Sequence, residues 1–369
     1  MATVLVSGAS GFIALHIVDI LLKKGYTVIA TVRTTEEAVA LHAKFEQIHP
    51  GAKLTFEIVP NIAANFAFED ALRGHPEIEY VIHTTSIAFG VGEDAESVFL
   101  KPAVNSTVNM FASIKKWGKS VRHVVFTSSL AAIMLTDKIQ DSGFVHTEET
   151  WNDMDWDEAK TNQTSAYCAA KTLAERAARE FVRKEDVKFT LSTVNPTYVL
   201  GPQLFQEAQA DKSLNAASQL INQALNLDPS SNGPFDSPSG LAVDVRDVAL
   251  FHVLPLEDPE KFANSRLFMA QSKFCLQTIL DVIRRNFPEL QSQVPKGDSK
   301  AGEDVLKTTV MNFDNSKTLE LADATLISFE KTICDSVRQV IDSRRDRADL
   351  RANAAKADAT NVEPEATSA

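Results

Sequence analysis

The chain has 369 residues, of which 44% are hydrophobic and 23% are charged, and its formal net charge at pH 7 is −12. This composition is typical of a soluble globular protein that buries a sizeable core. The negative charge excludes a general affinity for nucleic acid or for anionic membranes, although it leaves room for a local basic pocket that binds a phosphate.

The sequence predicts no targeting segment, membrane span, disulfide or metal site. The N-terminal stretch "MATVLVSGASGF" lacks a basic leader followed by an apolar stretch, and no run of about 18 apolar residues occurs. The cysteines Cys168, Cys275 and Cys334 are widely spaced and form no CxxC pair or Cys/His cluster. Free thiols suit a reducing compartment, so we expect the protein to be cytoplasmic.

The first half of the chain alternates strand-like and helix-like segments. Strands are predicted at 3–7, 26–32, 54–59, 80–84, 121–128 and 188–194. Helices are predicted at 12–24, 35–48, 65–73, 95–117 and 165–185. Apolar strands separated by amphipathic helices indicate a parallel sheet covered on both faces. Right-handed crossovers would make it a doubly wound α/β sheet, a Rossmann fold.

The alternation loosens after Pro196. A turn-rich loop is predicted at 228–240, a short helix at 243–254 and longer helices at 273–287 and 316–342. We expect a dinucleotide-binding domain at 1–195 with a return segment at about 241–271, and a smaller substrate-binding lobe at 196–240 and 272–343. The charged, alanine-rich stretch 344–369 is expected to be a solvated helix that frays into a disordered tail.

The stretch "VSGASGFIA" (6–14) carries a glycine pattern between the first strand and the first helix. Gly8, Gly11 and Ala14 are spaced as in dinucleotide-binding turns. Glycines permit a tight turn and a close approach to a pyrophosphate, and the helix N-terminus offers free N–H groups to that anion. A plain strand-to-helix turn is the weaker alternative.

The end of the second strand, "ATVRTTEE", bears on the choice of cofactor. NAD sites usually place an acidic residue here, whereas NADP sites place a basic one for the 2′-phosphate. Arg33 is therefore a candidate for the phosphate contact, and a solvated surface arginine is the alternative. Glu36 and Glu37 oppose the phosphate assignment electrostatically.

Two further stretches supply candidate catalytic groups. "FTSSLAA" (126–132) ends the fifth strand, and "SAYCAAK" (165–171) opens the next long helix. Tyr167 and Lys171 are four residues apart, so they are neighbours on one helix face. Ligands of open α/β sheets bind beyond the carboxyl ends of the strands, so Ser128 or Ser129 can face the same crevice as Tyr167.

The ordered motifs together resemble the extended short-chain dehydrogenase/reductase superfamily. "GFIALHIVDILLKKGY", "PAVN", "VVFTSS", "EETWN", "AYCAAKTLAE", "VNPTYVLGPQ" and "VDVRDVA" are similar to its dihydroflavonol-reductase-like branch. Within that branch the chain resembles the yeast NADPH-dependent methylglyoxal/3-methylbutanal carbonyl reductases. The likeness covers about residues 3–342 and leaves out the C-terminal tail.

The resemblance assigns catalytic roles to four residues. It implies that Tyr167 is the catalytic acid, and that Lys171 lowers the Tyr167 pKa toward the working pH and holds the nicotinamide ribose. Ser129 matches the serine that binds the substrate carbonyl, with Ser128 as the adjacent alternative. Asn105 matches an asparagine that supports a water relay to the lysine, although a capping or buried polar role is nearly as good an explanation.

The same resemblance outlines two sets of binding residues. The predicted cofactor contacts are Gly8, Ser10, Gly11, Phe12, Ile13, Arg33, Asn61, Ile62, Thr84, Tyr167, Lys171, Pro196 and Val199. The predicted substrate contacts are Phe89, Leu130, Met134 and Tyr198, of which Tyr198 can equally be a packing residue. The chain departs from the branch at Asn61, where an aspartate is usual, at Glu37, which replaces a lysine, and at the aliphatic Leu130 and Met134, which replace aromatics.

The expected function is reduction of aldehydes or ketones by NADPH, with methylglyoxal, 3-methylbutanal and bulky prochiral ketones as expected substrates. The expected partner is a small carbonyl compound, and the expected state is a monomer or homodimer. An NAD-dependent sugar-nucleotide epimerase or dehydratase is the first alternative; the absence of an acidic residue that directly ends the second strand weighs against it. A non-catalytic dinucleotide sensor is the second alternative, and such proteins often lose the tyrosine or lysine that this chain retains.

Overall fold

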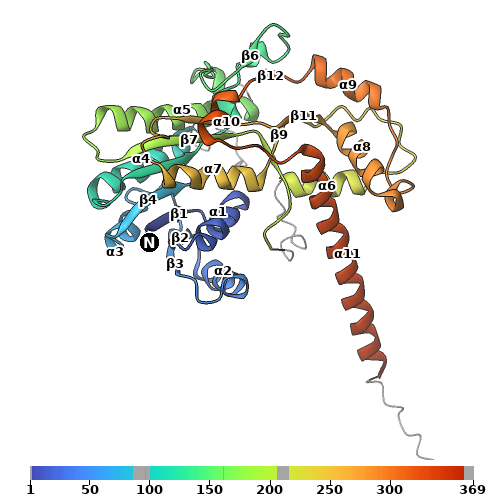
Figure 1. Ribbon diagram of the computed structural model, residues 1–369, viewed down its shortest axis with the longest axis horizontal. Coiled ribbons are helices and arrows are strands. Elements are labelled where there is room, and N and C mark those ends of the chain that lie inside the picture. The colour runs from blue at the N-terminus through green and yellow to red at the C-terminus, as the bar shows by residue number, and fades with distance from the viewer. Residues whose placement is uncertain (1, 86–95, 97–99, 161, 206–215, 361–369) are drawn as a thin grey trace, which may run out of the picture.

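A seven-stranded parallel sheet forms the centre of the molecule (Figure 1). The computed structural model describes residues 2–85, 96, 100–160, 162–205 and 216–360. The strand order is β10-β7-β5-β4-β1-β2-β3, and each neighbouring pair is parallel. The bounds are β1 (Thr3–Ser7), β2 (Thr27–Val32), β3 (Leu54–Ile58), β4 (Ile78–His83), β5 (His123–Thr127), β7 (Thr190–Pro196) and β10 (Arg266–Met269). The predicted doubly wound fold is confirmed.

Helices cover both faces of this sheet. One face packs against α1 (Phe12–Lys23), α2 (Thr35–Ile48) and α7 (Val245–Glu257). The other face packs against α3 (Glu69–Gly74), α4 (Lys101–Trp117) and α5 (Gln163–Lys184). With both faces covered, β1 and β5 are buried along their whole length and β4 at all but one residue, which explains their mostly apolar sequences.

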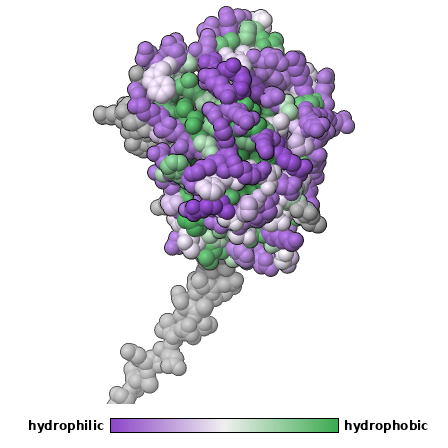
Figure 2. Space-filling view, turned by 90° about the vertical axis from the view of Figure 1, so that its left-hand side faces the viewer, coloured by the Kyte–Doolittle hydropathy of each residue, from purple (hydrophilic) through white to green (hydrophobic). Residues whose placement is uncertain are grey.

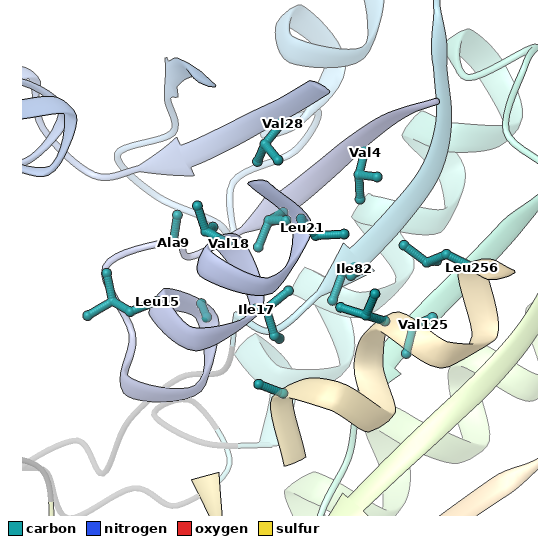
Figure 3. Packing of buried hydrophobic residues seen from close by; sticks show 14 of the residues in the cluster. Val4, Ala9, Leu15, Ile17, Val18, Leu21, Val28, Ile82, Val125 and Leu256 are labelled. Atoms are coloured by element: carbon teal, nitrogen blue, oxygen red, sulfur yellow. The ribbon is translucent and has the colours of Figure 1, made fainter. Parts of the chain in front are cut away.

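The packing of α1 shows how the first face is held together. Ile17, Val18 and Leu21 are fully buried, and Figure 3 shows them in one cluster with strand side chains and with Leu256 of α7. Leu21 lies four residues after Ile17 and three after Val18, so the three side chains form one stripe along the helix. Burial of each such side chain stabilises the fold by about 1.5–3 kcal/mol, and it fixes the N-terminus of α1 at the sheet edge.

A second, smaller sheet lies beside the first. Its order is β11-β9-β8, with β9 antiparallel to β11 and parallel to β8. Its apolar side chains share a core with α6, α8 and α11, while α9 packs against α8 and β11. The bounds are β8 (Tyr198–Leu200), β9 (Ser239–Asp244), β11 (Ser272–Cys275), α6 (Ala216–Leu225), α8 (Leu276–Asn286), α9 (Ser299–Thr308), α10 (Ser316–Ala322) and α11 (Phe329–Thr360). The two-residue strands β6 (Val145–His146) and β12 (Asn312–Phe313) pair separately.

Three predicted helices in the second half have wrong boundaries. Residues 273–275 belong to β11, because they pair with β9, and a capping box between Cys275 and Thr278 starts α8 at Leu276. The helix predicted at 243–254 begins only at Val245, since the residues before it end β9. The stretch 316–342 contains two helices, and α10 ends at Ala322 because the next residue, Asp323, has a left-handed φ of 48° that turns the chain.

The last helix, α11, runs outward from the body of the molecule, as Figure 1 shows. It includes residues 344–360, for which a helix was predicted. On the face shown in Figure 2, hydrophilic residues predominate and hydrophobic ones are visible between them. None of the helices in the described ranges combines the length and the apolar character that crossing a membrane requires.

Candidate active site

The turn between β1 and α1 forms one wall of a pocket. Gly8 has a φ of 67°, and a Cβ at this position would lie 3.0 Å from Thr85 Oγ1. Glycine is therefore favoured both by the left-handed backbone and by the close approach. Gly11 caps α1 without a side-chain hydrogen bond, which leaves the N–H groups of the first helical turn for an anion.

Most of the predicted cofactor contacts come together around this turn, in a pocket of about 600 Å³. The pocket lies beyond the carboxyl ends of β1, β2, β3 and β4, where ligands of open α/β sheets bind. Its predicted lining residues are Gly8, Ser10, Gly11, Phe12, Ile13, Arg33, Asn61, Ile62, Thr84 and Val199. The predicted contacts Tyr167, Lys171 and Pro196 are not part of this lining.

Two threonines, Thr31 and Thr85, line the pocket but are not among the predicted cofactor contacts. The Thr31 hydroxyl accepts a hydrogen bond from the Gly8 N–H at 3.2 Å, and Thr85 Oγ1 donates to Ser7 Oγ at 2.6 Å. Both residues line the pocket. Each lies at or just after the end of an apolar strand, which is the signal that would have identified them.

Arg33 and Glu37 form an ion pair at the rim of the pocket. Arg33 Nη2 lies 3.3 Å from Glu37 Oε1, and the Arg33 backbone N–H donates to Glu37 Oε2 at 3.0 Å. Thr34 caps α2 by accepting from the Glu37 N–H, so Glu37 has a fixed place in the first helical turn. The Arg33 side chain is 72% exposed. A phosphate that binds Arg33 therefore competes with a carboxylate that already contacts it.

Asn61 lies at the opposite rim of the pocket, after β3. Its side-chain carbonyl, which is predicted to contact the adenine, accepts a hydrogen bond from the Ala63 N–H at 3.0 Å. The neighbouring Ile62 is half-buried against the α3 and α4 core and also lines the pocket. Asn61 thus shapes the turn after β3 as well as the pocket wall.

The two candidate serines have different partners. Ser128 Oγ donates to the Glu175 carboxylate at 2.6 Å and is fully enclosed. Ser129 Oγ accepts the Ala131 N–H at 3.1 Å and forms a hydrogen bond with the Tyr167 side chain. The contact with Tyr167 supports Ser129 over Ser128 as the group that meets a substrate carbonyl.

Lys171 lies next to the tyrosine, but the expected effect on the Tyr167 pKa is wrong. Lys171 Nζ is 6.0 Å from the centre of the Tyr167 ring. Burial raises the pKa of Tyr167 above its ordinary value, and the hydrogen bond from Ser129 only partly opposes this. Burial also lowers the pKa of Lys171 to about 8. Burial thus affects the pKa of Tyr167 more than the proximity of Lys171 does, and it favours the protonated phenol.

His83 at the end of β4 is a buried structural histidine beside Lys171. Its Nδ1 lies 2.8 Å from Ser7 Oγ, and its ring stacks on Phe126. Burial lowers the His83 pKa to about 3, and the charge of Lys171 acts in the same direction. His83 is therefore neutral and joins the first strand to the fourth beneath the pocket.

Three of the predicted substrate contacts, Leu130, Met134 and Tyr198, pack against residues of the second lobe. Leu130 and Met134 are partly buried in a cluster that includes Ile133. Tyr198 is 46% exposed, and its ring packs edge-on against Phe274 at 5.3 Å. Phe89 lies outside the described residues. The described members of this set present aliphatic side chains and one exposed phenol.

Asn105 is not brought to Lys171 by any contact in the described part of the chain. It lies in the first turns of α4, and its side chain is exposed. Its role in a water relay stays a prediction. Within the described residues, no group of three or more His, Cys, Asp or Glu side chains is arranged to hold a metal ion, and the three cysteines are free and buried.

Comparison with known proteins identifies the family. The NAD dependent epimerase/dehydratase family model matches residues 4–269. The NADPH-dependent methylglyoxal reductase GRE2 of Saccharomyces cerevisiae is 37% identical over 344 residues, which are 92% of this chain and 98% of that protein. The ketoreductase azaE of Aspergillus niger is 32% identical over 339 residues, 92% of this chain and 97% of that protein.

A solved structure also resembles this chain over most of its length. Gre2 of Candida albicans, crystallised in complex with NADPH, is 36% identical and superimposes with a TM-score of 0.87 over 93% of this chain and 99% of that chain. The family model, the relatives and this structure all cover most of the chain. The chain therefore belongs to the NAD dependent epimerase/dehydratase family, as an oxidoreductase of the extended short-chain dehydrogenase/reductase type.

Proposed function

We propose that the protein is an NADPH-dependent carbonyl reductase that converts aldehydes or ketones to alcohols. The observation that carries this proposal is the contact of Ser129 with Tyr167, with Lys171 against the tyrosine ring, on the sheet edge that also bears the glycine-turn pocket. Methylglyoxal, 3-methylbutanal and bulky prochiral ketones are the proposed substrates. The reductase names of the relatives support this class of reaction.

The residues of the pocket fit a dinucleotide. Gly8 leaves the space that a Cβ would fill, and the uncapped first turn of α1 offers N–H groups to a pyrophosphate. Arg33 would hold the 2′-phosphate of NADPH, Asn61 and Ile62 would contact the adenine, and Thr84 and Val199 would lie along the rest of the cofactor. The NADPH in the crystal structure of the Candida albicans relative supports this choice of cofactor.

The chain itself supplies position and proton transfer. When bound, the reduced nicotinamide supplies a hydride for the carbonyl carbon. Ser129 Oγ holds the carbonyl oxygen by a hydrogen bond, and Tyr167 donates its phenolic proton to that oxygen. Burial raises the pKa of Tyr167 above its ordinary value, which favours the protonated phenol that a proton donor requires. The Lys171 ammonium beside the ring then stabilises the phenolate that remains.

We further propose that the two parts of the molecule bind different ligands. The main sheet binds the dinucleotide, and the lobe formed by 196–240 and 272–343 binds the substrate. The return segment joins them, because α7 packs on α1 while β10 completes the edge of the main sheet. Arg246 at the start of α7 pairs with Asp244 at 2.7 Å and with Asp335 of α11 at 2.8 Å, which ties the lobe to this segment.

A panel of carbonyl compounds tests the proposal. Purified protein is mixed with NADPH or NADH and each compound, and the absorbance of the reduced nicotinamide is followed. We expect NADPH to be consumed with at least one aldehyde or ketone, and Tyr167→Phe to abolish most of that consumption. A purified protein that carries bound NAD in its spectrum and reduces no carbonyl would instead indicate an epimerase or dehydratase.

A further inference from the structure

A buried carboxylate lies one helical turn beyond Lys171. Glu175 of α5 is fully buried, and its two oxygens face different parts of the protein. Glu175 Oε2 accepts from Ser128 Oγ at 2.6 Å and from Asn195 Nδ2 at 2.7 Å. Glu175 Oε1 accepts from Arg266 Nε at 2.7 Å, from Arg179 Nε at 3.1 Å and from the Thr193 hydroxyl at 3.2 Å. One oxygen thus faces the ends of β5 and β7, and the other faces two guanidinium groups.

The partners of Glu175 hold the chain segment that carries Ser129. The Asn195 side chain also donates to the Ser129 carbonyl at 3.2 Å. Arg266 Nη2 donates to the carbonyl of Ala132 at 3.1 Å, at the end of the short 3-10 helix that follows Ser129. Ser128, which donates to Glu175, is the residue directly before Ser129. The segment is therefore held before, at and after Ser129 by three groups that share one carboxylate.

The charge of Glu175 suits this role. Burial alone would raise the pKa of Glu175, but the neighbouring Arg266 and Arg179 outweigh it, so the pKa lies below its ordinary value and the group is a carboxylate. A carboxylate only accepts hydrogen bonds, and each of the five partners is a donor. Hydrogen bonds to an ionised group are shorter and stronger than neutral ones, which makes this a rigid hub.

We propose that Glu175 is a positioning residue of the reductase, which fixes Ser129 relative to Tyr167; this inference rests on the proposed function. Tyr167 and Glu175 lie two turns apart on α5, so the helix that carries the proton donor also carries the carboxylate that holds the serine segment. The contact between Ser129 and Tyr167 therefore depends on one rigid helix and one buried hub. Glu175 itself is not a catalytic residue, because it contacts Ser128 and not the Ser129 hydroxyl.

Glutamine at this position cannot replace the carboxylate. Its amide group has one acceptor oxygen and one NH₂ donor. If the NH₂ faces Ser128 and Asn195, it opposes the Asn195 donor; if it faces the other way, it opposes Arg266 and Arg179. Glu175→Gln therefore keeps the side-chain volume but loses one half of the network in either orientation.

Steady-state kinetics of the full-length protein with NADPH and one accepted carbonyl test this inference. Glu175→Gln should lower kcat about 10- to 100-fold, the scale expected when a reacting group is misplaced by a fraction of an ångström to 1 Å. The KM for NADPH should be unchanged, because the cofactor pocket is lined by other residues. In a Ser129→Ala background, Glu175→Gln should cost less than about twofold more, because its effect acts through Ser129.

Two further variants separate positioning from stability. Arg179→Gln removes one donor to Oε1 together with the Arg179 contacts to Thr193, Asn264 and Ser265, none of which belongs to the segment that carries Ser129. The substitution should therefore lower the melting temperature and leave kcat within about twofold of wild type. Ser128→Ala keeps every charge and removes one contact of Oε2, so it should lower kcat about three- to tenfold even if Glu175→Gln fails to fold.

The outcomes are distinct. If wild type reduces no carbonyl, the proposed function fails and this inference fails with it. If wild type is active but Glu175→Gln and Ser128→Ala both keep native kcat, only the positioning role is refuted. A kcat loss that is equally large in the Ser129→Ala background, or equally large in Arg179→Gln, would likewise assign Glu175 a general structural role and overturn the inference.

Discussion

The ion pair between Arg33 and Glu37 gives a quantitative prediction for cofactor choice. Glu37→Gln removes the carboxylate charge but leaves an amide oxygen for the Arg33 N–H that Glu37 Oε2 now accepts. The cap of α2 by Thr34 involves the backbone of residue 37 and is not affected. We expect the substitution to lower the KM for NADPH and to leave the KM for NADH unchanged, since only NADPH carries a 2′-phosphate.

The magnitude follows from the geometry. Arg33 Nη2 lies 3.3 Å from Glu37 Oε1, so a phosphate on the far side of the guanidinium lies on the order of 6 Å from the carboxylate, two contacts of about 3 Å each. One pair of unit charges at that distance repels by about 0.7 kcal/mol in water and about 2.8 kcal/mol at an effective dielectric of ~20. Because Arg33 is 72% exposed, solvent screening favours the lower end. About 1 kcal/mol corresponds to roughly a fivefold change in KM.

The assay measures KM for both cofactors at low and high salt with a saturating carbonyl. The effect of Glu37→Gln should shrink at high salt, where exposed charges are screened. Glu37→Lys should lower the KM for NADPH further, and Arg33→Ala should raise it. Glu36→Gln is the matched control, because Glu36 lies one residue away in the same helical turn but its carboxylate is hydrogen-bonded to Thr34 and to its own backbone, whereas that of Glu37 pairs with Arg33. Equal changes for NADPH and NADH, or a preference of wild type for NADH, would refute the phosphate assignment.

Further predictions concern the catalytic and substrate residues. Tyr167→Phe should lower turnover about 10²-fold or more with an unchanged circular dichroism spectrum, and near-native turnover would contradict the role of the phenol. Ser129→Ala should cost more kcat than Ser128→Ala, because only Ser129 contacts Tyr167; the reverse order would exchange their roles. Met134→Phe should depress activity on bulky aryl ketones more than on methylglyoxal, since methionine adapts to irregular space, and equal effects would argue against Met134 as a pocket residue. Burial lowers the pKa of Lys171 from 10.5 to about 8, so its ammonium is lost as pH rises through about 8, and kcat/KM should fall there in a pH–rate profile. The unfolded chain keeps this proton up to about 10.5, so the free energy of unfolding should rise over the same window, and a flat profile of both quantities would contradict the shift.

The cofactor half of the site could be predicted from the sequence because its signals are local. The glycines follow a strand of five residues and precede a helix of twelve. The parallel pairing of the main sheet then brings the carboxyl ends of its strands to one edge. Short strands carry no such signal: β8 has three residues and β10 has four, too few for an alternating pattern. They were missed because long-range pairing, and not their sequences, makes them strands.

The environment of the catalytic groups could not be predicted in the same way. A lysine four residues from Tyr167 indicates a lowered tyrosine pKa, but the sequence does not show that both groups are buried, and burial reverses the direction. The partners of Glu175 are also distant along the chain, since Asn195 is 20 residues away and Arg266 is 91. A charged residue among the small apolar positions of α5 was the available signal, because such a charge is rarely buried without partners.

The spacing along α5 explains why Lys171 can keep a low pKa beside a buried carboxylate. Tyr167, Lys171, Glu175 and Arg179 follow one another at steps of four residues, and each step turns about 40° around the helix. A lone carboxylate four residues from Lys171 would raise the pKa of the lysine. Glu175 is instead neutralised by Arg266 and Arg179, and burial is the cause that sets the Lys171 pKa. Burial therefore sets the pKa of Lys171, while the paired carboxylate one turn further along the same helix anchors the segment of Ser129.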